Sequence, residues 1–337
     1  MRMPRTVALV LVLSASSIAS SQSEIPDIDD SSRRRPLGNR NQVPLALLFV
    51  SLTPDRATAL EKGRLELDAV FDYSNIIFHR EVENELLHLD MEYLRTLVTA
   101  RRGFGWGLEL GVELPVYAYF GGIFDTFVSS FHETFGFPNH LRGSTPPGLA
   151  EFEYRRGGEV VLAGAGFFGG VGDLAIHARK ELYRGDSHAF SVRTALKLPT
   201  GDPQKLSGSG AADLGVGLAF QRVRPRYGLY LNGGYHFLGD GEPFETRDYV
   251  AVSAAVDWRF KPRVAAVLQT DFMSPPVRME ILKVNPGLNL GLGLRYRHSD
   301  AFTYEWRFVE DLSKFATDFT FVFQVEMRTK GPEGKGR

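Results

Sequence analysis

The sequence predicts an all-β fold: a closed antiparallel transmembrane β-barrel of about 12 strands, with one helical insertion in a long loop. Three observations support this prediction. The chain begins with an export signal, apolar and polar residues alternate in run after run, and short and long connections follow one another in strict order. The 35 glycines, 25 phenylalanines and 12 tyrosines among the 337 residues also suit a barrel with an apolar outer face and a small-residue or polar interior.

The first residues match a signal peptide. Arg2 and Arg5 form a positive n-region, a short apolar run follows, and Ser17 and Ala19 stand at the −3 and −1 positions of a cleavage site. The apolar run is too short for a membrane-spanning helix. We therefore expect residues 1–19 to be removed on export, and because no cysteine follows them, this is not a lipoprotein signal.

The composition excludes several kinds of site and partner. The chain has no cysteine, so disulfides and thiolate metal sites are impossible. Its eight histidines are scattered without an H-x-x-x-H or H-E-x-x-H motif, so we predict no metal site, and no cofactor is expected. A formal net charge of −1 and the lack of an extended basic block argue against a nucleic-acid partner.

Period-2 alternation locates the strands. In the clearest case, residues 288–297, leucines and a tyrosine take every second position, with Asn289, glycines and arginines between them. The second strand changes its phase near Leu94, which predicts a bulge. The predicted strands cover residues 64–74, 86–100, 104–116, 171–183, 187–198, 212–221, 226–238, 247–260, 262–273, 287–298, 301–309 and 316–328.

The connections between these strands fall into two alternating classes. Short turns lie at 101–103, 184–186, 223–225, 261 and 299–300, and longer connections at 75–85, 117–170, 199–211, 239–246, 274–286 and 310–315. Outer-membrane barrels combine tight periplasmic turns with long external loops, whereas a β-sandwich, the alternative, mixes connection lengths. We expect residues 63–328 to form the barrel, 20–62 a mobile periplasmic lead-in, and 329–337 a polar tail.

The connection at 117–170 is unusually long and contains a predicted helix at 123–135. Phenylalanines share one side of this helix, and Asp125, Ser129 and His132 share the other. We expect the insertion to act as a plug or a lid. Its candidate pore or plug residues are Asp125, Ser129, His132, Phe135, Phe137 and Arg142.

Two motifs in this insertion admit a catalytic or cofactor interpretation. Asp125, Ser129 and His132 include the residue types of a hydrolytic triad, but one helix face rarely provides the serial hydrogen bonds and oxyanion hole that the reaction needs. Residues 164–169 spell G-x-G-x-x-G, yet a dinucleotide site needs a helix after the glycines, and an alternating strand follows here. We therefore predict no catalytic residue and interpret the glycines as a turn.

Charged side chains occupy many positions predicted to face the lumen. Both signs occur, which fits either a wet, weakly selective channel or an interior ion-pair network that fills the barrel. Inward glycines reduce the interior bulk and favour an open lumen. The predicted lumen-facing charges are Glu109, Glu113, Asp173, His177, Arg193, Asp213, Asp257, Asp271, Arg295, Arg297, Glu305 and Arg307.

Several phrases of the chain resemble the DUF3187 family, a group of bacterial proteins predicted to be outer-membrane proteins. The most specific is FDTFVSSFHETFGFPNHLR at 124–142, and the others lie at 36–37, 40–45, 63–67, 110–115, 170–173 and 310–311. The resemblance covers nearly all of the mature chain. Because the family carries no established activity, the resemblance implies an outer-membrane barrel and no mechanism.

We expect the protein to lie in the bacterial outer membrane, and three functions stay open. The first is a non-catalytic channel or transporter for small molecules with 117–170 as plug or lid. The second is an outer-membrane hydrolase using Ser129, His132 and Asp125, and the third is a structural or adhesive barrel with a sealed lumen. The expected partners are outer-membrane lipid, the barrel-assembly machinery during biogenesis and, for a channel, a small-molecule solute.

Overall fold

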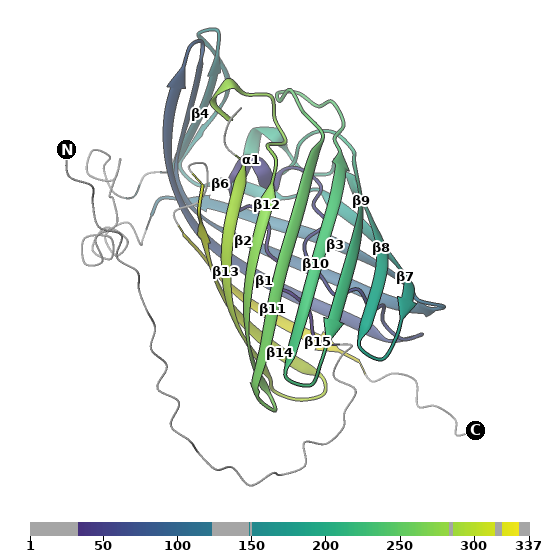
Figure 1. Cartoon of the computed structure of the whole chain (residues 1–337). Helices are drawn as coiled ribbons and strands as arrows, with labels where there is room; N and C mark the ends of the chain where they lie inside the picture. The colour runs from purple at the N-terminus through teal and green to yellow at the C-terminus, as the bar shows by residue number, and fades with distance from the viewer. Residues whose placement is uncertain (1–32, 123–147, 149, 283–285, 314–318, 330–337) are drawn as a thin grey trace, which may run out of the picture.

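The computed structural model describes residues 33–122, 148, 150–282, 286–313 and 319–329, and its strands form one antiparallel sheet that closes on itself (Figure 1). Twelve strands make the ring, and the first of them pairs with the last. Among the described residues, no helix is long and apolar enough to cross a membrane. The ring consists of β1 (Leu65–Val82), β2 (Glu85–Gly105), β3 (Leu108–Phe120), β7 (Leu174–Arg184), β8 (His188–Leu198), β9 (Asp213–Val223), β10 (Tyr227–Phe237), β11 (Tyr249–Lys261), β12 (Val264–Met273), β13 (Gly287–Arg297), β14 (Phe302–Asp311) and β15 (Phe319–Arg328).

The closed barrel confirms the predicted fold class, and each predicted strand overlaps one strand of the ring. Alternation decides which side chains face outward. In β9, Leu214, Val216 and Leu218 are exposed, whereas Asp213 and Gly215 between them are buried. An outer face of this kind suits lipid, because its apolar side chains can contact lipid without a cost in free energy, and the polar side chains point into the barrel. The predicted signal peptide, residues 1–19, lies outside the described residues.

The predicted connection at 75–85 is wrong, because β1 and β2 continue through it as one long hairpin. A tight turn at Glu83 and Asn84 joins them, with Glu83 in the left-handed region at φ 51°. The residues before the turn include Ile76 and Phe78, which favour strands. The polar residues around the turn hide this preference in the sequence.

Three further strands pair with the ring or with one another, and two of them extend the sheet at the hairpin. β4 (Glu151–Arg156) pairs with the far part of β2, β5 (Glu159–Ala165) pairs with β4, and the short β6 (Phe168–Val171) pairs with β3. The G-x-G-x-x-G sequence spans the end of β5, a two-residue turn and the start of β6. Gly166 has φ +76°, and a Cβ at Gly169 would lie 2.4 Å from the Tyr117 carbonyl oxygen. No helix follows, so the glycines serve backbone geometry.

β2 has no bulge near Leu94, since its pairing with β1 keeps one register from end to end. Its inward side chains change instead from Thr99 and Arg95 to Leu89 and Leu87, all of them buried. The phase change in the sequence therefore marks a change in what the inner face touches, from a polar interior to an apolar one.

A bulge does occur between β6 and β7. Val116 of β3 pairs with Val171, and Glu113 pairs with Ala175, so the stretch with Asp173 holds one extra residue. A bulge re-aims a side chain. Here Asp173 is buried and accepts a hydrogen bond from Lys197 Nζ at 2.6 Å.

Residues 33–62, which we call the lumen segment, run through the interior of the barrel instead of forming a mobile lead-in (Figure 1). An ascending limb, 33–43, follows β11 to β13 from the end with the short turns (the turn end). The short helix α1 (Pro44–Leu47) lies at the end with the long loops (the loop end). A descending limb, 48–62, returns along β10, β9, β7 and β3.

The outer face yields a first prediction. Leu292 is 53% exposed in the middle of β13, so Leu292→Arg would place a charge against lipid and destabilise the barrel by about 2–4 kcal/mol. Urea unfolding of the protein in phospholipid vesicles measures this. Val160→Arg is the matched control, because Val160 is 54% exposed on β5, outside the ring. Equal losses for the two variants would contradict the lipid-facing assignment.

Candidate functional site

Side chains of the barrel wall hold the backbone of the descending limb. A buried backbone N–H needs an acceptor, and at intervals along the limb an inward side chain supplies one. The pairs are Val50 N with Asp213 Oδ2 (3.0 Å), Leu52 N with His236 Nε2 (3.1 Å), Asp55 N with Asn232 Oδ1 (3.1 Å), Ala57 N with Gln221 Oε1 (2.7 Å), Ala59 N with Glu181 Oε2 (2.8 Å) and Leu60 N with Glu109 Oε2 (2.9 Å). The wall is therefore complementary to this particular chain path.

The ascending limb is held in the same way. The Gln269 amide both accepts from Leu37 N (2.8 Å) and donates to Leu37 O (2.9 Å), as a neighbouring strand would. Nearer the turn end, Arg34 donates to both carboxylate oxygens of Asp257 at 2.8 and 2.7 Å. This fork-shaped pairing fixes direction as well as position.

Inward glycines make room for the segment. A Cβ at Gly293 would lie 2.4 Å from a methyl carbon of Leu37, and one at Gly287 would lie 2.3 Å from the side chain of Asn41. The expectation that these glycines keep the lumen open is therefore not met. They accommodate a chain that fills part of it.

A network of buried charges joins the lumen segment to the wall at the turn end. Arg56, fully buried, donates to Glu66 at 3.0 Å and to Glu109 at 3.2 Å. Arg35 donates to Asp68 at 2.8 Å and forms an ion pair with Glu326 at 2.9 Å. Paired guanidinium and carboxylate groups offset the cost of removing each charge from water.

Asp55 carries the negative charge of the segment into this network. Its buried carboxylate pairs with Arg179, with Arg101 at 3.3 Å and with Arg56 at 4.0 Å. Asp55 is therefore an anchor held by three arginines.

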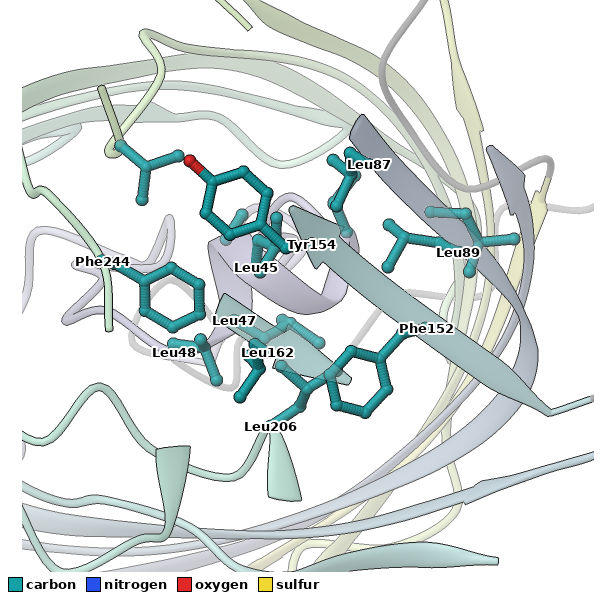
Figure 2. Packing of buried hydrophobic residues seen from close by; sticks show 14 of the residues in the cluster. Leu45, Leu47, Leu48, Leu87, Leu89, Phe152, Tyr154, Leu162, Leu206 and Phe244 are labelled. Carbon is teal, nitrogen blue, oxygen red and sulfur yellow. The ribbon is translucent and has the colours of Figure 1, made fainter. Parts of the chain in front are cut away.

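An apolar cluster closes the loop end (Figure 2). Leu45, Leu47 and Leu48 of α1 and its flank pack against side chains from β2, β4, β5 and two loops. Those partners include Leu87, Leu89, Phe152, Tyr154, Leu162, Leu206 and Phe244. Because Phe152, Tyr154 and Leu162 belong to the predicted 117–170 insertion, its described part covers the loop end together with α1.

Between the two ends the interior is less tightly filled. Cavities with about 530, 410 and 390 Å³ of empty space border the descending limb at Thr53, Pro54 and Asp55. Polar and charged side chains, Arg193 and Arg101 among them, line these cavities together with apolar groups. The lumen is thus obstructed by the segment, and spaces remain beside it.

The structure describes all of the charges predicted to face the lumen and none of the predicted pore or plug residues. Of the charges, His177, Asp271 and Arg297 are half-buried, and the others are buried. Asp125, Ser129, His132, Phe135, Phe137 and Arg142 all lie outside the described residues. No group of three or more His, Asp or Glu side chains within the described ranges is placed to hold a metal ion.

The lumen segment was missed from the sequence, although it carries a signal. The run PLALLFV at 44–50 is too apolar for a mobile solvated tail. Arg34, Arg35, Asp55 and Arg56 around it are the opposite charges that a charged barrel interior requires. Neither feature alternates, so a search for strands passes over both.

Comparison with known proteins places the chain among barrel proteins. The DUF3187 family, described as a protein of unknown function, matches residues 12–329. The COG4313 outer membrane channel from Pseudomonas putida F1 is 11% identical over 83% of this chain and 100% of that chain, with a TM-score of 0.56. A Pseudomonas aeruginosa FadL homologue is 8% identical over 87% of this chain and 95% of that chain, with a TM-score of 0.42. No curated protein matches the chain. At such identities the similarity concerns the fold, which is that of a bacterial outer-membrane channel.

The Arg56 anchor gives a second prediction. Arg56→Gln would leave Glu66 and Glu109 with fewer counter-charges in a buried site and destabilise the protein by about 3–5 kcal/mol. Urea unfolding in vesicles measures the loss. Arg64→Gln is the control, because its pair with Glu61 is exposed and such pairs contribute about 0–1 kcal/mol. If both variants unfold at the wild-type urea concentration, Arg56 is no anchor.

A third prediction concerns Asp55. Asp55→Asn would leave the buried guanidinium group of Arg179 and the half-buried one of Arg101 with fewer counter-charges and destabilise the protein by about 3–5 kcal/mol. Urea unfolding in vesicles measures the loss. Asp186→Asn, in an exposed turn, is the control and should change the stability little. Equal stability of the wild type and Asp55→Asn would contradict the anchor.

Proposed function

The chain belongs to the DUF3187 family, and from its occupied barrel we propose that it is a non-catalytic outer-membrane channel for small molecules, closed in its resting state by its own lumen segment. The barrel resembles outer-membrane channels in fold, and its exposed apolar outer face suits a lipid environment. Outer-membrane lipid is accordingly one partner, and the barrel-assembly machinery another during biogenesis.

The observation that carries this proposal is how the segment is attached. Within the described chain, no backbone–backbone hydrogen bond links residues 33–62 to a ring strand. Side-chain bonds and ion pairs hold the segment, so it can leave one arrangement without breaking the sheet. A closure built in this way can open, whereas a further strand of the sheet could not.

The 117–170 insertion is proposed as the lid. Its described strands place Phe152, Tyr154 and Leu162 on α1, which supports a role in closing the loop end. Asp125, Ser129, His132, Phe135, Phe137 and Arg142 remain candidate plug residues. The hydrolase alternative also depends on residues in this undescribed part, and no described observation favours it.

A sealed structural or adhesive barrel is the second candidate, because a filled lumen also fits a protein that transports nothing. The polar cavities beside Thr53 and Asp55 favour the channel. A core built only for stability would be packed without such spaces.

A reversible lock tests the channel, the fourth prediction. Ala57 of the lumen segment packs with Ala189 and Ala219 of the wall, and the chain has no cysteine of its own. In Ala57→Cys/Ala219→Cys, a disulfide would fix the segment to β9. We expect single-channel openings of the wild type in planar bilayers, none from the oxidised double variant, and recovery on reduction.

The control places both cysteines on the wall, as Ala189→Cys/Ala219→Cys, and should conduct whether oxidised or reduced. Deleting residues 124–142 tests the lid separately and should raise conductance. Absence of conductance from the wild type, the reduced variant and the deletion variant alike would favour the sealed barrel over the channel.

A further inference from the structure

One interior cavity lies between the two limbs of the lumen segment. Asn39 borders it from the ascending limb and Ser51 from the descending limb, while Arg193, Asn232 and Ser253 border it from the wall. Small inward residues on the surrounding strands leave the space open. It has about 530 Å³ of empty space, and its polar groups are arranged by sign.

One side of the cavity offers hydrogen-bond donors and positive charge. Arg193, 7% exposed, donates to Thr53 O at 2.8 Å and to Asn232 Oδ1 at 3.2 Å, and forms no ion pair with any described carboxylate. Asn232 Oδ1 also accepts from Asp55 N, which fixes the orientation of its amide. Asn232 Nδ2 is then a buried donor without a described partner. We call this side the donor pole.

The other side offers acceptors and negative charge. Asp271 accepts from Asn39 Nδ2 at 3.2 Å and from Gln269 Nε2 at 2.7 Å, and likewise forms no ion pair within the described residues. Because Asn39 Nδ2 faces Asp271, Asn39 Oδ1 is a buried acceptor without a described partner. This side is the acceptor pole.

Buried charges and polar atoms left without partners are costly, and native interiors rarely retain them. Here three such atoms, Asn232 Nδ2, Asn39 Oδ1 and Ser253 Oγ, belong to residues that line one cavity. Elsewhere in the same lumen, Arg56, Arg34 and Arg35 are each paired with carboxylates. The contrast separates this cavity from the anchoring network.

We propose that this cavity binds a small solute with a carboxylate at one end and hydroxyl or ammonium donors at the other. The carboxylate lies on Arg193 and Asn232, and the donors point to Asp271 and Asn39. The assignment rests on the proposed function in one respect, since a solute reaches the cavity only through the lumen. It names the class of solute that such a channel takes.

Isothermal titration of the purified full-length protein in detergent tests the site, with L-serine as the probe. Serine supplies a carboxylate together with ammonium and hydroxyl donors, whereas acetate supplies only the anion and ethanolamine only the donors. We expect serine to bind at least about tenfold more tightly than either fragment, since each pole contributes charge-assisted hydrogen bonds. Acetate or chloride binding as tightly as serine would overturn the acceptor pole.

Three variants identify the poles. Arg193→Gln and Asp271→Asn should each weaken serine binding about tenfold or more, and Arg193→Lys should retain part of it. Asp271→Asn keeps the shape of the side chain, so it remains informative if Arg193→Gln folds poorly. Arg297→Gln, a lumen arginine that does not line the cavity, is the control.

Undetectable binding of serine to the wild type, or unchanged binding in both pole variants, would overturn the proposal. This failure is distinct from failure of the channel function. A protein that conducts ions but binds no serine loses only the solute assignment, whereas one that binds serine without ever conducting loses only the channel.

Discussion

The structure depends on one constraint: a polypeptide that runs through a barrel without joining its sheet must find its hydrogen-bond partners among side chains or within itself. Side chains of the wall meet this requirement along both limbs. Asp213, Asn232, Gln221 and Gln269 accept from the backbone of the segment. Where no partner is needed, glycines leave the space that the segment occupies. The side chains of the inner face therefore match the path of the lumen segment, which is part of the same chain.

The two ends of the lumen are closed by different forces. At the turn end, charged groups hold the segment with strict geometry, which an ion pair provides and apolar contact does not. At the loop end, α1 packs in an apolar cluster. Many side chains contribute to the stability of this cluster, and no single contact fixes its geometry. The cavities lie between these two ends, beside the descending limb. A rigid anchor, a permissive cap and a looser middle form a coherent arrangement for a closure that moves.

The strands could be predicted from the sequence because a residue between lipid and lumen has only two environments. In β13, that rule alone separates the outward leucines from Asn289 and Arg295. The rule fails where the environments change. The part of β2 that precedes Arg95 faces an apolar interior, so its alternation of apolar and polar residues is lost although its pairing with β1 keeps one register. The lumen segment lies outside the rule altogether, because its residues meet wall side chains on several sides and follow no period. The partners of Arg193 and Asp271 depend on chain segments far apart in sequence, so the poles of the cavity could not be foreseen.

The position of the segment across the junction of the first and last ring strands has a consequence for assembly. Arg35 contacts Asp68 on β1 and Glu326 on β15, and Arg328 of β15 contacts Glu66 of β1, which Arg56 also holds. The strands on either side of this seam are the farthest apart in the ring along the chain, and their meeting closes the largest loop of the fold. The lumen segment therefore cross-links, through its arginines, the two strands whose pairing closes the ring.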